Sequence, residues 1–366
     1  MEQVNQKQDS KKMIHIELLR IIAAFLVIFN HTGDKGYFLF SQYDTSTIQY
    51  WLYMTISVLC QISVPLFLMI SGALLLKKDW NLKDIFKKIL RILVVLVVFT
   101  SIYYIRLHIL KYSSEFSIKD FILRLYKGDI IIPFWYLYAY IAFLLTLPFL
   151  RNLVKNLPEY AYQYLIVLSI IFVSILPSLE YRFTLNEVTL NTYGNPTWIF
   201  INIFIFPLIG YYSENIVDIT KLSKKNIIIL LISLAFGIFS TCYMTNLKHR
   251  ITGICTEVET QDFMKNYVLI MAIPIYLFVK YFINAKKIPT IVSKIILSLG
   301  SCSFGIYLIH MLFTGNKLIL NLLKYLTTVL EFNYMFSILL ICFLIFIICY
   351  FITFVLKKIP GIKKYI

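Results

Sequence analysis

The sequence predicts an all-α integral membrane protein, a bundle of about ten transmembrane helices with both termini in the cytoplasm. Of its 366 residues, 59% are hydrophobic and 15% charged, and the mean hydropathy is +0.77. No soluble core of this size needs so much apolar surface. Apolar runs long enough to cross a bilayer recur along the chain, and Lys and Arg gather in alternate connecting segments. The formal net charge of +16 therefore indicates cytoplasmic loops rather than a nucleic-acid partner.

The apolar runs place the expected elements in order along the chain. The first run lacks a small-x-small cleavage site, so we expect no cleaved signal peptide. Residues 14–356 are expected to form one transmembrane domain between a cytoplasmic tail at 1–13 and another at 357–366. The expected spans are 14–32, 50–76, 89–106, 131–150, 161–178, 197–213, 226–245, 266–284, 290–313 and 333–356.

The first span carries three chemically active side chains in an otherwise apolar run. Arg20 and His31 are eleven positions apart, which on a helix is three turns plus about 20°, so both share one face about 16 Å apart. Glu17 lies within about 60° of Arg20. An arginine at mid-membrane costs about 2.5–3.5 kcal/mol on insertion scales. Such residues face a bundle interior or a watery cavity, so the three are candidates for catalysis.

The second span contains a proline and a pair of small residues. Pro65 is expected to kink the helix. Ser71 and Gly72 would let another helix approach closely, and Ser71 is also a candidate for the binding site.

A cluster of cations follows this span directly. One interpretation is a topology signal typical of a cytoplasmic loop. The other is a phosphate-binding rim, since clustered cations at the mouth of a pore attract polyanions, and it makes Lys77, Lys78 and Arg91 candidates for donor binding. The whole cluster comprises Lys77, Lys78, Lys83, Lys87, Lys88 and Arg91.

The linker 107–130 contains the signature of a short helix. Ser117 and Asp120 have the spacing of an N-terminal cap, and Gly128 provides a stop. We expect an amphipathic helix lying on the outer surface.

Two further spans supply candidate binding residues. Trp135 and Tyr138 begin the fourth span, where they form either an interfacial aromatic belt or part of a site lining. In the ninth span Ser303, Tyr307 and His310 are spaced i, i+4 and i+7 and so share a face. That span runs outward, and we expect His310 at the depth of His31, with both imidazoles facing one cavity closed by aromatic residues of the fourth span.

These residues carry a family resemblance. Arg20 and His31 match the R-x10-H signature of the membrane-bound acyltransferase-3 family, the bacterial O-acyltransferases that modify surface polysaccharides, and Glu17 stands where that family has an acidic residue. The expected number of ten spans also matches this family. Three further stretches resemble its recurrent patches in the same order: FLMISG at 67–72, FWYLYAYIAFLLTLPFL at 134–150 and FGIYLIH at 304–310.

The resemblance implies an enzyme of the bacterial cytoplasmic membrane that takes acyl-CoA, most simply acetyl-CoA, from the cytosol. The acceptor would be a hydroxyl of a glycan or a lipid-linked glycan. His31 is the candidate base or nucleophile, because neutral imidazole serves either role. Arg20 would hold a donor carbonyl or phosphate, or balance Glu17. Some members carry a C-terminal extracytoplasmic hydrolase-like domain that is not present before Ile366, so a second transfer step would need another protein.

Two other functions compete with this hypothesis. A carrier exporting a glycan or small solute would use Glu17, Arg20, His31 and His310 as an ion relay, and unlike an acyltransferase it would leave acetyl-CoA intact. A glycan polymerase would need a larger outer loop than the sequence offers. No CxxC pair or Cys/His ligand spacing predicts a metal site, and no permanently bound cofactor is expected.

Overall fold

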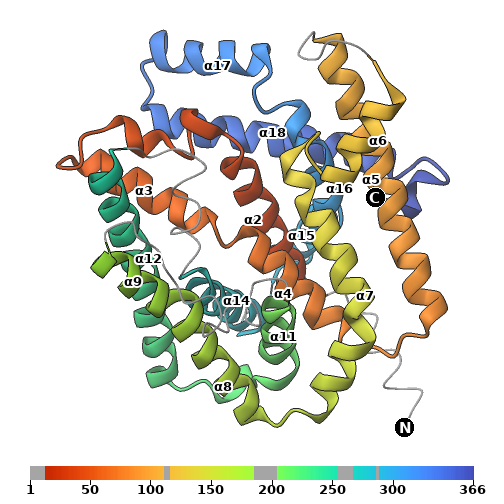
Figure 1. Cartoon of the computed structure of the whole chain (residues 1–366), viewed down its shortest axis with the longest axis vertical. Helices are drawn as coiled ribbons and strands as arrows, with labels where there is room; N and C mark the ends of the chain where they lie inside the picture. The colour runs from red at the N-terminus through yellow and green to blue at the C-terminus, as the bar shows by residue number, and fades with distance from the viewer. Residues whose placement is uncertain (1–12, 111–115, 185–203, 254–266, 286–287) are drawn as a thin grey trace.

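The computed structural model describes residues 13–110, 116–184, 204–253, 267–285 and 288–366, and every regular element within these ranges is a helix (Figure 1). The predicted all-α class is confirmed for this part of the chain. The α-helices are α2 (Ile14–Asn30), α3 (Ile48–Cys60), α4 (Ser63–Leu75), α5 (Leu82–Ile109), α6 (Ile118–Lys127), α7 (Trp135–Asn156), α8 (Glu159–Ser169), α9 (Leu176–Thr184), α11 (Ile205–Tyr211), α12 (Lys224–Thr252), α14 (Val268–Ala285), α15 (Thr290–Ser301), α16 (Ser303–Ile309), α17 (Lys317–Thr328) and α18 (Tyr334–Leu356).

The predicted count of ten spans is not confirmed. By length and composition five helices of the described part can cross a membrane, and a sixth is obtained if α15 and the segment 303–312, which meet at 43°, form one broken span. Helix α2 has 17 residues, and the predicted span 197–213 lies partly outside the described residues. The cytoplasmic placement of both ends stays a prediction. The five helices are Ile48–Leu75, Ile132–Asn156, Glu159–Phe183, Lys224–Ile251 and Tyr334–Leu356.

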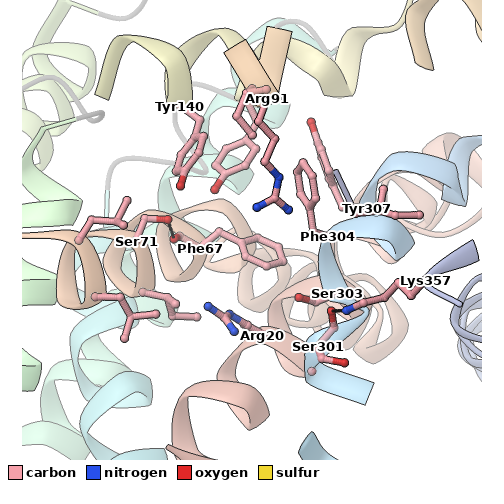
Figure 2. A pocket seen from close by; sticks show the side chains of 17 residues that line it. Arg20, Phe67, Ser71, Arg91, Tyr140, Ser301, Ser303, Phe304, Tyr307 and Lys357 are labelled. Carbon is pink, nitrogen blue, oxygen red and sulfur yellow. Dashed lines mark hydrogen bonds between the residues drawn. The ribbon is translucent and has the colours of Figure 1, made fainter. Parts of the chain in front are cut away.

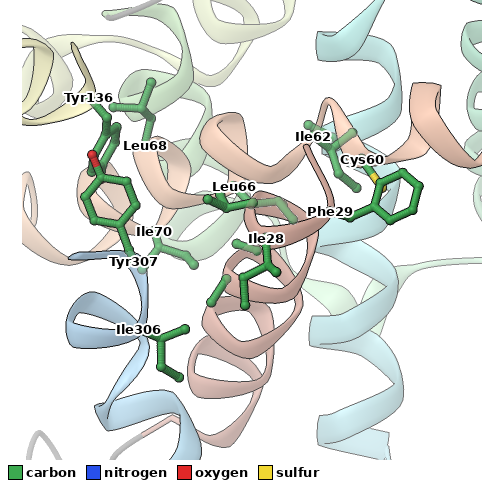
Figure 3. Packing of buried hydrophobic residues seen from close by; sticks show 14 of the residues in the cluster. Ile28, Phe29, Cys60, Ile62, Leu66, Leu68, Ile70, Tyr136, Ile306 and Tyr307 are labelled. Carbon is green, nitrogen blue, oxygen red and sulfur yellow. The ribbon is translucent and has the colours of Figure 1, made fainter. Parts of the chain in front are cut away.

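Helix α2 lies at the centre of the bundle and contacts α3, α4, α14, α15, α16 and α18 (Figure 1). Its side chains at Leu19, Ile28 and Phe29 are completely enclosed, and Ala23 is too. Figure 3 shows Phe29 beside Cys60 and Ile62, and Ile28 beside Leu66 of α4. Because this apolar packing holds α2 on several sides, it also fixes the positions of the polar residues that the helix carries.

The kink expected at Pro65 takes the form of a break between two helices. Helix α3 ends at Cys60 and α4 begins at Ser63. Pro65 stands in the first turn of α4, where its missing N–H costs no hydrogen bond. The break changes the direction of the chain beside the end of α2, and Asn30 of α2 donates to the carbonyl of Cys60 and to Ser63 across it.

The close helix approach expected at Gly72 is confirmed. A Cβ atom added to Gly72 would overlap the backbone of Pro207 in α11, and one added to Gly210 would overlap the backbone of Met69 in α4. The two glycines therefore let α4 and α11 cross with their backbones in contact, as small residues do between membrane helices.

The short helix expected in the linker is also present. Ser117 caps α6 by accepting from the backbone N–H of Asp120, and Gly128 ends it with φ +73°. Tyr104 of α5 donates to the Asp120 carboxylate at 2.8 Å, which ties α6 to the neighbouring long helix.

Candidate active site

Two histidines from distant parts of the chain form a hydrogen-bonded pair. His31 follows the last residue of α2, and His310 follows the last residue of α16. The Nε2 atom of His310 lies 3.1 Å from Nδ1 of His31, and the ring centroids are 5.1 Å apart. The prediction that these imidazoles lie together is therefore confirmed.

Backbone carbonyls assign the tautomers of the pair. Nδ1 of His31 lies 2.8 Å from the carbonyl oxygen of Val27, and Nδ1 of His310 lies 2.6 Å from that of Tyr307. A carbonyl only accepts, so each Nδ1 carries a proton. The single Nδ1–H of His31 is then shared between the carbonyl of Val27 and Nε2 of His310, both of which accept from it. Nε2 of His31 is left with a lone pair, and within the described residues it has no hydrogen-bond partner.

His31, which carries this free Nε2, lines a cavity of about 240 Å³, here called the histidine cavity. Its lining comes from the segment after α2, the turn before α17, and the facing sides of α17 and α18. His310 is fully buried and does not line it. The residues are His31, Thr32, Gly33, Asp34, Lys35, Thr314, Gly315, Ile319, Leu320, Leu323, Ile338, Ile341 and Ile345.

Arg20 and Glu17 form an ion pair one turn apart on α2. Nη1 of Arg20 lies 2.6 Å from Oε1 of Glu17. Glu17 is 5% exposed, and its second oxygen, Oε2, is buried and has no hydrogen-bond partner among the described residues. The pairing with Arg20 lowers the cost of burying this carboxylate.

A second cavity of about 330 Å³, here called the arginine cavity, lies beside Arg20. Figure 2 shows the guanidinium groups of Arg20 and Arg91 reaching toward it from opposite sides, with the amine of Lys357 at its edge. Lys357 donates to the carbonyl of Ser301 at 2.7 Å, and Arg91 donates to the carbonyl of Tyr365 at 3.2 Å. Three cations at one apolar-walled cavity favour a ligand with several negative charges.

The arginine cavity contains some of the predicted residues and not others. Arg20, Ser71, Arg91, Ser303 and Tyr307 all line it. Of the three residues expected to share a face, Ser303 and Tyr307 line this cavity, whereas His310 does not.

Two aromatic candidates do not reach either cavity. Trp135 is 47% exposed, and Tyr138 donates to the carbonyl of Leu125. The tyrosines of α7 that line the arginine cavity are Tyr136 and Tyr140, which are one helical turn apart. Tyr138 is about 200° from Tyr136 around the helix, so it points away from the cavity. The lining role expected of Tyr138 belongs to the opposite face of α7, which carries Tyr136 and Tyr140.

Two cationic candidates also lie elsewhere. Lys77 and Lys78 are exposed in the segment after α4 and line neither cavity. Asp79 beside them pairs with Lys155 and Arg151 at the end of α7, and the hydrogen bond from Lys155 helps to hold the pKa of Asp79 below its usual value. These ion pairs hold the segment against α7. At the arginine cavity itself, the cation that the sequence analysis did not predict is Lys357.

The expectation of one cavity shared by both imidazoles is wrong. The two cavities have no lining residue in common, and a row of rings runs between them. Successive ring centroids are 5.5 Å apart from Tyr136 to Tyr307, 6.1 Å from Tyr307 to His310 and 5.1 Å from His310 to His31. Tyr307 and His310 in the middle of this row are both buried, so the row is closely packed between the two cavities.

A buried polar cluster near the start of α2 was not predicted. Glu214 accepts from His15 and from Tyr276, each at 3.0 Å, and its carboxylate lies 4.0 Å from the ammonium of Lys280. Lys280 also donates to the carbonyls of Ser213, Glu214 and Val217. The signal available in the sequence was a lysine, Lys280, inside the apolar run 266–284. We call His15, Glu214, Tyr276 and Lys280 the Glu214 cluster.

The fold and site thus define a multi-pass helical membrane protein with a hydrogen-bonded histidine pair at one of two cavities. The model of the acyltransferase-3 family, described as an acyltransferase domain, matches residues 13–354, and the chain belongs to this family. The match supports acyl transfer as the reaction. No curated protein and no solved structure gives a significant match to this chain.

Proposed function

We propose that the chain transfers an acyl group, acetyl in the first instance, from acyl-CoA to a hydroxyl of a cell-surface polysaccharide or its lipid-linked precursor. The observation that carries this proposal is the histidine pair, in which Nε2 of His31 keeps a lone pair beside a cavity. The cationic arginine cavity on the other side of the ring row supports an anionic donor. The membrane is that of a bacterial cell in this proposal, and the donor arrives from the cytosol.

The donor's phosphates would be held in the arginine cavity. Arg20, Arg91 and Lys357 offer N–H groups that match phosphate oxygens. Arg20 already pairs with Glu17, so it brings less net charge than the other two. Because the ring row separates the cavities, the thioester reaches His31 only when Tyr307 and its neighbours move apart.

In the proposed reaction, an acceptor hydroxyl in the histidine cavity gives its proton to Nε2 of His31 while its oxygen bonds to the thioester carbonyl carbon. The carbon–sulfur bond then breaks, and the imidazolium returns the proton to the departing thiolate, which yields an ester and a free thiol. His310 accepts the Nδ1–H of His31 and stabilises the charge on its ring. A route through an acyl-imidazole uses the same lone pair, and rapid quenching without acceptor distinguishes the two.

Consumption of acyl-CoA tests the proposal directly. We expect the full chain in lipid nanodiscs to release CoA from acetyl-CoA when membrane-derived glycan acceptor is present. We also expect mass spectrometry of surface glycan to show an acyl mass increment only in cells that contain the protein. Intact acetyl-CoA together with altered export of glycan would contradict acyl transfer and favour the carrier.

Neutralising the arginine cavity is expected to weaken donor binding. Arg91→Gln and Lys357→Gln should each raise KM for acetyl-CoA about tenfold, equivalent to about 1.4 kcal/mol, with a smaller effect at high salt. The measurement is initial-rate kinetics at two ionic strengths. The matched control is Lys83→Gln, an exposed cation on the same helix as Arg91. Unchanged donor KM in both variants would remove these residues from the donor site.

A further inference from the structure

One wall of the histidine cavity is a continuous apolar strip on a membrane-spanning helix. Ile338, Ile341 and Ile345 of α18 line the cavity, and their i, i+3, i+7 spacing puts them on one face of the helix. The strip extends about 10 Å along α18 at 1.5 Å per residue. Helix α18 is the most apolar of the candidate spans, with a mean hydropathy of 3.2. The strip begins at Ile338, near the N-terminal end of this helix, and runs toward the membrane interior.

The opposite wall is the inner face of α17. Ile319, Leu320 and Leu323 of this helix line the same cavity. Its other side carries Lys317 and Lys324, which are exposed. The cavity is therefore apolar on both sides over its length. A free sugar gains nothing from such walls, whereas a hydrocarbon chain gains about 25 cal/mol for each Å² that it buries.

Most of the polar lining of the cavity comes from the segment that begins at His31. Asp34 and Lys35 both line it and are both exposed, and neither forms an ion pair within the described residues. The Lys35 ammonium complements an anionic group such as a phosphate, and the Asp34 carboxylate is an acceptor for sugar hydroxyls. A ligand with an apolar chain, an anionic link and a hydroxylated head therefore matches the cavity from one end to the other.

We infer that the histidine cavity binds a lipid-linked glycan, with the lipid chain between α17 and α18 and the sugar at His31. This inference rests on the proposed function, and it selects the lipid-linked precursor over the finished polysaccharide as acceptor. The hydroxyl that is acylated then belongs to a sugar close to the lipid, because the apolar strip begins beside the reacting nitrogen.

Photolabelling tests where the lipid binds. The probe is a prenyl phosphate with a diazirine on its chain, irradiated with the full chain in phosphatidylglycerol nanodiscs and mapped by mass spectrometry. We expect labels in residues 317–345 that a prenyl-phosphate sugar removes and added phosphatidylglycerol does not. Leu320→Trp, which fills the cavity, should reduce the label at least fivefold. Leu318→Trp is the matched control, because Leu318 is 75% exposed on the same helix.

The outcomes separate this inference from the proposed function. Leu320→Trp should lose glycan acylation together with the photolabel, and Lys35→Gln should weaken competition by the prenyl-phosphate sugar about threefold or more. Labels elsewhere, equal labelling of Leu320→Trp, or equal competition by phosphatidylglycerol would each overturn the inference. Labelling decides the question even if the protein consumes no acetyl-CoA, a result that would contradict the proposed function alone.

Discussion

Replacing His31 by alanine is expected to abolish acyl transfer, with a loss of at least about 10³-fold, because the variant has no base or nucleophile in the histidine cavity. The bundle should stay folded, since the imidazole is partly exposed and its backbone partner, Val27, lies in the preceding turn. The measurement is CoA release with acceptor, together with the acyl content of surface glycan. Free imidazole added to the variant should restore part of the rate.

A closely matched control exists on another helix. His108 donates from Nδ1 to the carbonyl of Tyr104, four residues earlier, at 2.9 Å, which repeats the geometry of His31 and Val27. His108→Ala removes the same kind of hydrogen bond at a residue that lines neither cavity and should leave the rate unchanged. His310→Ala should fall between the two variants, because it removes only the group that accepts from His31. Near-normal glycan acylation by His31→Ala would exclude His31 from the mechanism.

The sequence predicted the parts of the site that lie on a single helix face. Ser303 and Tyr307 were placed together by their spacing, and both line the arginine cavity. Glu17 and Arg20 were placed together in the same way and form an ion pair. A regular helix fixes the angle between such residues, so no tertiary information is needed.

The sequence did not predict which face of an aromatic run turns inward. Tyr136, Tyr138 and Tyr140 alternate with apolar residues on α7, and hydrophobic periodicity is uninformative where every face is apolar or aromatic. Packing against Phe67 and Tyr307 selects Tyr136. The ten-span count is not confirmed for a related reason, since breaks such as the one between α15 and α16 divide an apolar run into shorter helices.

Contacts between distant segments were also not predicted from the sequence. Glu214 meets His15 across 199 positions and Tyr276 across 62, and no local spacing encodes such pairs. The histidine pair is the exception, because both members were placed at equal depth by the lengths of their spans. Depth limits which residues can meet, whereas rotation around the helix axis decides which of them do.

Replacing Lys280 by methionine is expected to destabilise the whole bundle. Lys280 is 7% exposed, and it donates to three backbone carbonyls while facing the Glu214 carboxylate. Its loss leaves a buried carboxylate without its cation, which costs about 3–5 kcal/mol. That is a large part of a typical total of about 5–15 kcal/mol. Thermal unfolding followed by tryptophan fluorescence should show Tm lowered by roughly 10 °C.

A second substitution separates loss of the cation from loss of packing. Glu214→Gln placed on top of Lys280→Met removes the uncompensated charge, so the double variant should recover part of the lost Tm, and the two changes should not add. Lys225→Met, at an exposed position near the start of α12, is the control and should leave Tm unchanged. An unchanged Tm in Lys280→Met would show that the Glu214 cluster adds nothing to stability. A double variant as unstable as the sum of its parts would show that the ammonium acts through the carbonyls of Ser213, Glu214 and Val217 rather than through the carboxylate.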